Sequence, residues 1–256
     1  MGVRVPPEAP PFGSLRDLAA KRASLRAARR RLRAAARLGL RLALGAVGLC
    51  VLWVGLYAAV PPPTTALIEI ERARLGSVSR NWRPLAEISP HLARAVVAAE
   101  DARFCQHNGF DRAAIEAAWR SRMEGGALRG GSTISQQTAK NAFLWPERSW
   151  SRKALEAGFT ALIELLWSKR RILEVYLNIA EFGPGVFGAE AAAQRWFGKP
   201  ASALTAAESA RLATLLPAPR SRDPNALSPA LQRRARAIAD GAATLRATGA
   251  DACVFD

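Results

Sequence analysis

Hydrophobic side chains recur every three or four positions over most of the chain after residue 67, a spacing that predicts a mainly helical protein. One helix is expected to begin after Ser89, because Ser is a good N-cap and Pro90 follows at the first helical position. No strand-like alternation of useful length occurs, and residues 182–188 predict a loop. Further helices are expected from Arg152, Lys169, Ala189, Thr205 (with Glu208 as a capping box) and Ser228, and the helix from Lys169 carries the stripe Ile172, Val175, Tyr176 and Ile179.

A longer apolar segment precedes this helical region. Leu42–Val60 has nineteen residues without a charge, and as a helix it would extend roughly 28 Å, close to the thickness of bilayer hydrocarbon. The segment is long for a signal peptide, and the sequence AAVPPP at its end is a poor cleavage site. We therefore expect one uncleaved transmembrane helix.

Positive charge is concentrated ahead of this segment. The formal net charge is +16, and residues 1–41 hold eleven basic and two acidic residues. A nucleic-acid-binding domain would carry its charge on the folded part, so we expect no nucleic-acid partner. The asymmetry predicts a cytoplasmic N-terminus, with the remaining chain on the other side of the membrane. The expected divisions are a basic leader (1–41), a transmembrane helix (42–60), a linker (61–80), a folded domain (81–225) and a C-terminal helix and tail (226–256).

Three cysteines are present. Cys50 lies in the apolar segment, whereas Cys105 and Cys253 would face an oxidising compartment. Two cysteines so far apart do not make a disulfide framework, so we do not expect them to be bonded.

An acidic pair ends the helix that begins after Ser89. Val96, Val97 and Phe104 lie three or four residues from Glu100. Apolar neighbours penalise the charged form of a carboxylate, which suits a general base that works near neutral pH. The alternative is that Glu100 and Asp101 form an ordinary solvated helix end, with Asp101 paired to a nearby Arg. We expect a structural role for His107.

The segment GGSTISQQTAKN, residues 130–141, is polar and contains no acid. We expect Ser132 to cap a helix whose first amides, with two Gln side chains and Lys140, bind an anion. The pattern of a nucleotide P-loop is absent. Plain helix capping is the alternative.

A basic cluster follows, in which Arg152 and Lys153 precede Glu156 by four and three residues. The cluster, which also includes Arg148, is either a second set of anion contacts or an intrahelical ion pair of small energy.

These segments occur in an order that resembles glycosyltransferase family 51, the peptidoglycan glycosyltransferases. The resemblance rests on EDARFCQHNGFD, GGSTISQQTAKN, RKALE and KRRILEVYLNIAEFGPGVFGAEAAAQRWFGK, within about residues 80–220. The chain has no S-x-x-K and no K-T-G, which a transpeptidase domain would carry. The short basic leader, the single apolar span and the WPERSWSRKALEAG context are most similar to the monofunctional, Gram-negative branch of the family.

The resemblance implies a lysozyme-like, mainly α fold with a small membrane-proximal lobe. It implies polymerisation of lipid II into β-1,4 glycan strands with inversion, with Glu100 as the base and Glu156 as a second motif carboxylate. Expected partners are lipid II, the growing strand, membrane lipid and proteins of cell-wall synthesis or division. No cofactor is required, although a divalent cation such as Mg²⁺ at the pyrophosphate is left open. The expected substrate-binding residues are Asp101, Phe104, Ser132, Thr133, Gln136, Gln137, Lys140, Asn141, Arg148, Arg152 and Lys153.

Two alternatives are kept. A membrane-anchored glycan hydrolase would share the fold and one catalytic Glu, but it would not need cations for a pyrophosphate. A non-enzymatic scaffold in a cell-wall assembly would show a degenerate site, whereas Glu100, Lys140, Arg148 and Glu156 are all present.

Overall fold

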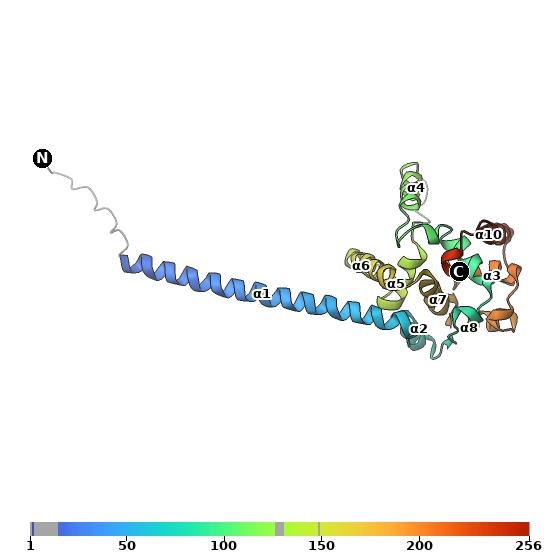
Figure 1. Ribbon diagram of the computed structural model, residues 1–256, viewed down its shortest axis with the longest axis horizontal. Helices are drawn as coiled ribbons and strands as arrows, with labels where there is room; N and C mark the ends of the chain where they lie inside the picture. The colour runs from blue at the N-terminus through green and yellow to red at the C-terminus, as the bar shows by residue number, and fades with distance from the viewer. Residues whose placement is uncertain (1, 3–14, 126–130, 148, 256) are drawn as a thin grey trace. The chain divides into compact units, whose positions relative to one another are not determined.

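The computed structural model describes residues 2, 15–125, 131–147 and 149–255 (Figure 1). These residues form two compact units, Met1–Leu52 and Trp53–Asp256. The elements are α1 (Leu15–Ala59), α2 (Ala66–Leu75), β1 (Ser79–Arg80), η1 (Leu85–Glu87), α3 (Pro90–Glu100), η2 (Phe104–Gln106), α4 (Arg112–Met123), α5 (Ile134–Phe143), α6 (Trp150–Leu166), α7 (Lys169–Ile179), β2 (Glu181–Gly183), β3 (Val186–Phe187), α8 (Ala189–Phe197), η3 (Ala201–Ala203), α9 (Ala206–Ala213), α10 (Pro229–Thr248) and α11 (Ala252–Phe255).

The first unit consists of the N-terminal part of α1. The helix begins at Leu15, inside the basic leader, because residues 15–38 are rich in Ala, Leu and Arg and contain no Gly or Pro. Its leucines remain exposed, including Leu44 at 63% and Leu52 at 72%. Among the described residues, this is the one helix that is long and apolar enough to cross a membrane. An exposed apolar surface of this length is stable in lipid.

The last turns of α1, from Trp53, belong to the second unit and are attached to it through their backbone. The carbonyl of Val54 accepts a hydrogen bond from Trp167 Nε1 at 2.8 Å, and the carbonyl of Tyr57 accepts from Arg171 Nε at 3.0 Å. Tyr57 lies in the last turn of α1, where backbone carbonyls have no partner within the helix, so Arg171 supplies the missing donor. The rings around this contact are Trp53, Tyr57, Phe143, Phe159 and Trp167.

The core of the second unit is built around α7. All four residues of the predicted stripe are buried, and Leu173 and Leu177 on the other side of the helix are also fully buried. Helices α5, α6, α8 and α11 pack against α7, so it is covered on several sides, while α3 packs against α9 and α10. The prediction of a mainly α fold is confirmed.

The helix starts follow the predicted capping signals. Ser89 caps α3 and Ser228 caps α10, each with Pro at the next position. The capping box of Thr205 and Glu208 is present at α9. The helix predicted from Arg152 begins two residues earlier, at Trp150, because Ser149 is its cap.

A three-stranded sheet of order β1-β3-β2 replaces part of the predicted loop at 182–188. Strand β1 is parallel to β3, and β2 is antiparallel to it. The turn between β2 and β3 requires Gly185, which has φ +70°, and a Cβ there would lie 2.9 Å from Leu75 Cδ1. Strands of two or three residues are too short to produce an alternating pattern, so hydrophobic periodicity does not reveal them.

The expectation that the two distant cysteines are unbonded is wrong. Cys105 in η2 and Cys253 in α11 form a disulfide, with their Cα atoms 5.6 Å apart. The tertiary fold brings the C-terminal segment next to α3 and α7 (Figure 1), a proximity that sequence spacing does not reveal. A disulfide that closes so long a loop typically stabilises a fold by about 2–4 kcal/mol.

Candidate active site

The carboxylate of Glu100 is held at the C-terminal end of α3. This end of a helix carries partial negative charge, so a carboxylate there needs compensating donors. Gln137 of α5 supplies one, because its Nε2 donates to Glu100 Oε2 at 2.9 Å. The side chain of Glu100 is half-buried and lines an open cleft.

Tyr176 fixes the orientation of that Gln137 amide. Its hydroxyl donates to Gln137 Oε1 at 3.2 Å, so the amide nitrogen is turned toward Glu100. Burial, and the negative charge of Glu100, raise the pKa of Tyr176 well above its usual value, so the hydroxyl keeps its proton. The apolar spacing along this helix predicts only that Tyr176 belongs to a buried stripe. The missed signal is that a buried Tyr hydroxyl usually needs a hydrogen-bond partner.

The N-terminus of α5 already has an anion bound, and it is the protein's own Asp101. Asp101 Oδ2 accepts from the Ile134 amide at 3.0 Å. Thr133 is the N-cap, and it forms a capping box with Gln136. The prediction that Ser132 caps this helix is therefore wrong, and the Ile134 amide, which was expected to help bind a substrate anion, is occupied by Asp101. The reason is tertiary, because α3 delivers a carboxylate to the helix start.

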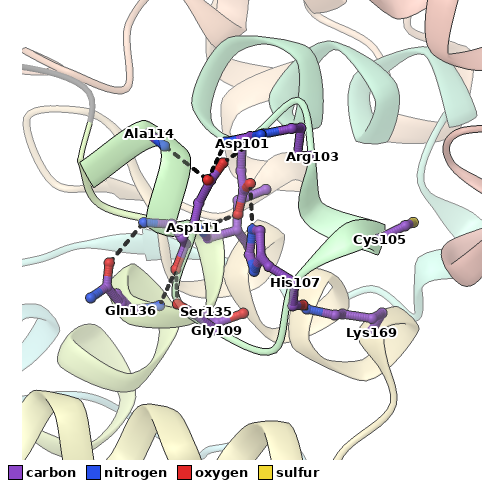
Figure 2. A network of polar contacts seen from close by, with 12 residues as sticks. Asp101, Arg103, Cys105, His107, Gly109, Asp111, Ala114, Ser135, Gln136 and Lys169 are labelled. Carbon is purple, nitrogen blue, oxygen red and sulfur yellow. Dashed lines mark hydrogen bonds and ion pairs between the residues drawn. The ribbon is translucent and has the colours of Figure 1, made fainter. Parts of the chain in front are cut away.

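A polar network surrounds Asp101 (Figure 2). His107 Nε2 lies 2.8 Å from Asp101 Oδ1, and Arg103 Nε donates to Asp111 Oδ2 at 3.0 Å. Burial raises the pKa of Asp101, while the hydrogen bonds from His107 and Ile134 lower it less. The prediction that His107 is structural agrees with this position. The alternative, in which Asp101 pairs with a nearby Arg, is wrong for Arg103, because Arg103 pairs with Asp111.

The predicted ion pair on α6 is present and buried. Arg152 Nη1 lies 2.7 Å from Glu156 Oε2, and Lys153 is hydrogen-bonded to the other oxygen of Glu156. Arg152 and Glu156 are 7% and 3% exposed, so solvent screens this pair far less than a surface pair. Arg152 Nε is buried and has no hydrogen-bond partner among the described residues. The arrangement fixes the guanidinium in the wall of the cleft.

One cleft of about 1000 Å³ joins these groups. Its wall also includes Leu216 and Pro217, which follow α9 and which sequence reasoning did not identify. Cations, donors and two carboxylates thus meet in one space large enough for a sizeable ligand. The predicted residues that line it are Glu100, Ser132, Gln136, Gln137, Lys140, Arg152, Lys153 and Glu156.

Other predicted residues lie elsewhere. Asp101, Phe104 and Thr133 are buried behind the cleft wall, so their positions do not support direct contact with a substrate. Phe104 is fully buried, with Lys169 Nζ 4.5 Å from its ring centre. Asn141 is on α5 but does not line the cleft. Arg148 lies outside the described residues.

Comparisons with known proteins identify the family of this chain. A family model described as Transglycosylase matches residues 68–243. The chain is 57% identical over 209 residues to a biosynthetic peptidoglycan transglycosylase of Jannaschia sp. (strain CCS1), covering 82% of this chain and 86% of the relative. It is 53% identical over 220 residues to a protein of the same name from Rhodospirillum centenum, covering 84% and 95%. A third relative of that name, from Caulobacter vibrioides, is 56% identical over 169 residues, covering 66% and 74%.

The Asp101 network generates a stability prediction. Asp101→Ala leaves the Ile134 amide and the His107 ring without their buried acceptor, so we expect the free energy of unfolding to fall by about 2–4 kcal/mol. Thermal unfolding followed by circular dichroism measures the change. Asp240→Ala removes an exposed carboxylate and is the matched control. An Asp101→Ala variant that melts with the control would contradict the proposed role of this carboxylate.

Proposed function

Because the chain belongs to the transglycosylase family, we propose that it is a peptidoglycan glycosyltransferase that polymerises lipid II into β-1,4-linked glycan strands. The observation that carries this proposal is the composition of one cleft, where the Glu100 carboxylate is accompanied by Lys140, Arg152 and Lys153. Polymerisation needs a base for a sugar hydroxyl and cations for a departing pyrophosphate. Hydrolysis of a finished glycan needs no such cations.

The proposed reaction is one displacement. Glu100 takes the proton of the acceptor sugar's 4-hydroxyl, and the freed oxygen pair attacks the anomeric carbon of the donor. The bond from that carbon to the lipid pyrophosphate breaks, and the pyrophosphate leaves with the bonding electrons. Attack from the opposite side inverts the configuration. Pyrophosphate is a weak base, so cations can stabilise it without a second general acid of the kind that inverting glycosidases use.

Arg152 is the best-supported pyrophosphate contact. Its side chain lines the cleft and is held in place by Glu156. Guanidinium groups bind phosphate oxygens through several donors at once, and a side chain that is already fixed needs little rearrangement. Glu156 is then a positioning residue, which fixes Arg152 and Lys153 toward the cleft.

A divalent cation such as Mg²⁺ would be held mainly by the substrate's own phosphates. Both oxygens of Glu156 are already paired with cations. Within the described part of the chain, one group of three side chains could ligate a metal: Asp101, His107 and Asp111. Arg103 already neutralises Asp111, and Asp101 is saturated by His107 and Ile134. These residues do not fit a resident cation, and no step is assigned to one.

The proposed site faces a membrane that carries its lipid-linked substrate. Helix α1 would anchor the chain with its basic end in the cytoplasm. The disulfide supports a periplasmic location for the catalytic domain, because such bonds persist in oxidising compartments. Three exposed apolar side chains of α4 lie four residues apart and therefore on one face of the helix: Ile115, Trp119 and Met123. We propose that this face lies in the lipid surface.

Glu100→Gln tests the base. The amide cannot accept the hydroxyl proton, so we expect polymerisation of lipid II to fall by a factor of about 10²–10⁴ with the melting temperature unchanged. Purified full-length protein in detergent is incubated with labelled lipid II, and polymer is separated by gel. Glu87→Gln, an exposed carboxylate in η1, is the control. Near-normal polymerisation by Glu100→Gln would show that Glu100 is not the base. Cleavage of finished glycan by the wild type would favour a hydrolase.

Tyr176→Phe tests the orientation of Gln137. Without the hydroxyl, the Gln137 amide is free to turn its oxygen toward Glu100, so we expect kcat to fall about fivefold to tenfold with little change in KM. Tyr57→Phe removes the chain's other tyrosine hydroxyl and is the matched control. Equal kcat values for Tyr176→Phe and the wild type would show that the amide is fixed by other contacts.

Arg152→Gln tests the pyrophosphate contact. Loss of a charge-assisted hydrogen bond of about 1.5–3 kcal/mol predicts a fall in kcat/KM of roughly 10–150-fold. The same variant should lose inhibition by added inorganic pyrophosphate. Arg233→Gln, on the exposed side of α10, is the control. Pyrophosphate inhibition equal to that of the wild type would place the leaving group elsewhere.

A further inference from the structure

The C-terminal segment 251–255, here named the C-terminal clamp, contacts three elements that lead to the cleft. It consists of Asp251 and the short helix α11. The family match ends at residue 243, so the clamp lies beyond the segment that defines the family. Its Asp251 and Val254 are nevertheless buried, at 5% and 2% exposed. A chain end that is buried to this degree is tied down by specific contacts.

The first attachment is to α3, the helix that carries Glu100. Arg94 Nε lies 2.5 Å from Asp251 Oδ2, and the Arg94 guanidinium lies 4.2 Å from the ring centre of Phe255. The Arg94 side chain is 16% exposed, so the ion pair is largely shielded from solvent. One side chain of α3 is thus held by both ends of the clamp.

The second attachment is covalent and lies in the turn after Glu100. The disulfide joins Cys253 to Cys105, five residues beyond Glu100. Figure 2 shows the Cys105 side chain pointing away from the pair of Asp101 and His107, which holds the other part of the same turn. The turn of residues 101–107 is therefore fixed from two directions, by Asp101 on the start of α5 and by Cys105 on the clamp.

The third attachment is to α7. Arg170 Nη1 donates to the Val254 carbonyl at 3.0 Å. The neighbouring Lys169 donates to the His107 carbonyl at 2.6 Å, so α7 holds the turn as well as the clamp. The same helix carries Tyr176, which orients Gln137 toward Glu100.

We propose that the C-terminal clamp is a positioning element for Glu100, and that the Cys105–Cys253 disulfide closes it. The proposal rests on the proposed function for the role of Glu100. The clamp connects the helix that bears the carboxylate, the turn that follows it and the helix that orients its hydrogen-bond donor. Misplacement of a reacting group by a fraction of an ångström lowers a rate strongly, whereas substrate affinity depends on the remaining contacts. An open clamp therefore lowers kcat and leaves KM nearly constant.

Reduction of the full-length protein tests this in two independent readouts. The first is amide hydrogen exchange across residues 101–107, where the Phe104 and Gln106 amides are hydrogen-bonded within the turn. Reduction should speed exchange there at least tenfold, and this readout does not depend on lipid II activity. The second is the kinetics of lipid II polymerisation, where reduction should lower kcat about tenfold with KM within a factor of two. Reoxidation should restore both values.

Variants separate positioning from general stability. Cys253→Ser should match the reduced wild type and be insensitive to reductant, while Cys50→Ser, which removes the unbonded cysteine, should behave as the wild type. Asp251→Asn, which leaves the disulfide intact, should lower kcat to a smaller extent at temperatures well below melting. If Cys253→Ser does not fold, the kcat of Asp251→Asn tests whether the clamp positions Glu100. Unchanged exchange after reduction overturns the clamp. Faster exchange with unchanged kcat overturns its role in positioning, and an inactive wild type with reduction-sensitive exchange overturns the proposed function alone.

Discussion

The buried contact between Asp101 and the start of α5 determines the geometry of the site. A helix N-terminus attracts negative charge, and here the charge comes from the residue that ends α3. Because Glu100 is the preceding residue, and because Gln137 lies three positions after Ile134, this contact places the carboxylate beside the donor amide. His107 occupies the other Asp101 oxygen. Two helices distant in sequence are thereby joined at the proposed active site.

The cleft separates two electrostatic tasks between helices. The C-terminal end of α3 presents the Glu100 carboxylate, which accepts a hydrogen bond from Gln137. Helix α6 presents Arg152 and Lys153, both of which are held by a buried Glu156. The charges of Arg152 and Lys153 are balanced within α6, because each of them pairs with one oxygen of Glu156.

The surroundings of the site are attached at their edges. The last turn of α1 is bonded to α7 through the Tyr57 carbonyl, and the C-terminal segment is bonded to the same helix through the Val254 carbonyl. Most side chains of α7 are buried, so both attachments are made to a core helix. The apolar helix α1 and the C-terminal clamp are thus both bonded to the helix that carries Tyr176.

The sequence by itself determined the helices, the apolar anchor and the motif carboxylates. Capping residues and periodic apolar positions are local signals, so Ser89, Thr205 and Ser228 were sufficient to locate helix starts. The order of the motifs indicated the family, and eight of the predicted site residues line one cleft. Only the tertiary structure decided what each polar group faces. It assigned the start of α5 to Asp101 and not to a substrate, turned Tyr176 toward Gln137, and brought Cys253 to Cys105. These contacts join residues between 33 and 148 positions apart. Their partners are selected by the packing of α3, α5, α7 and α11, and no local pattern carries that information.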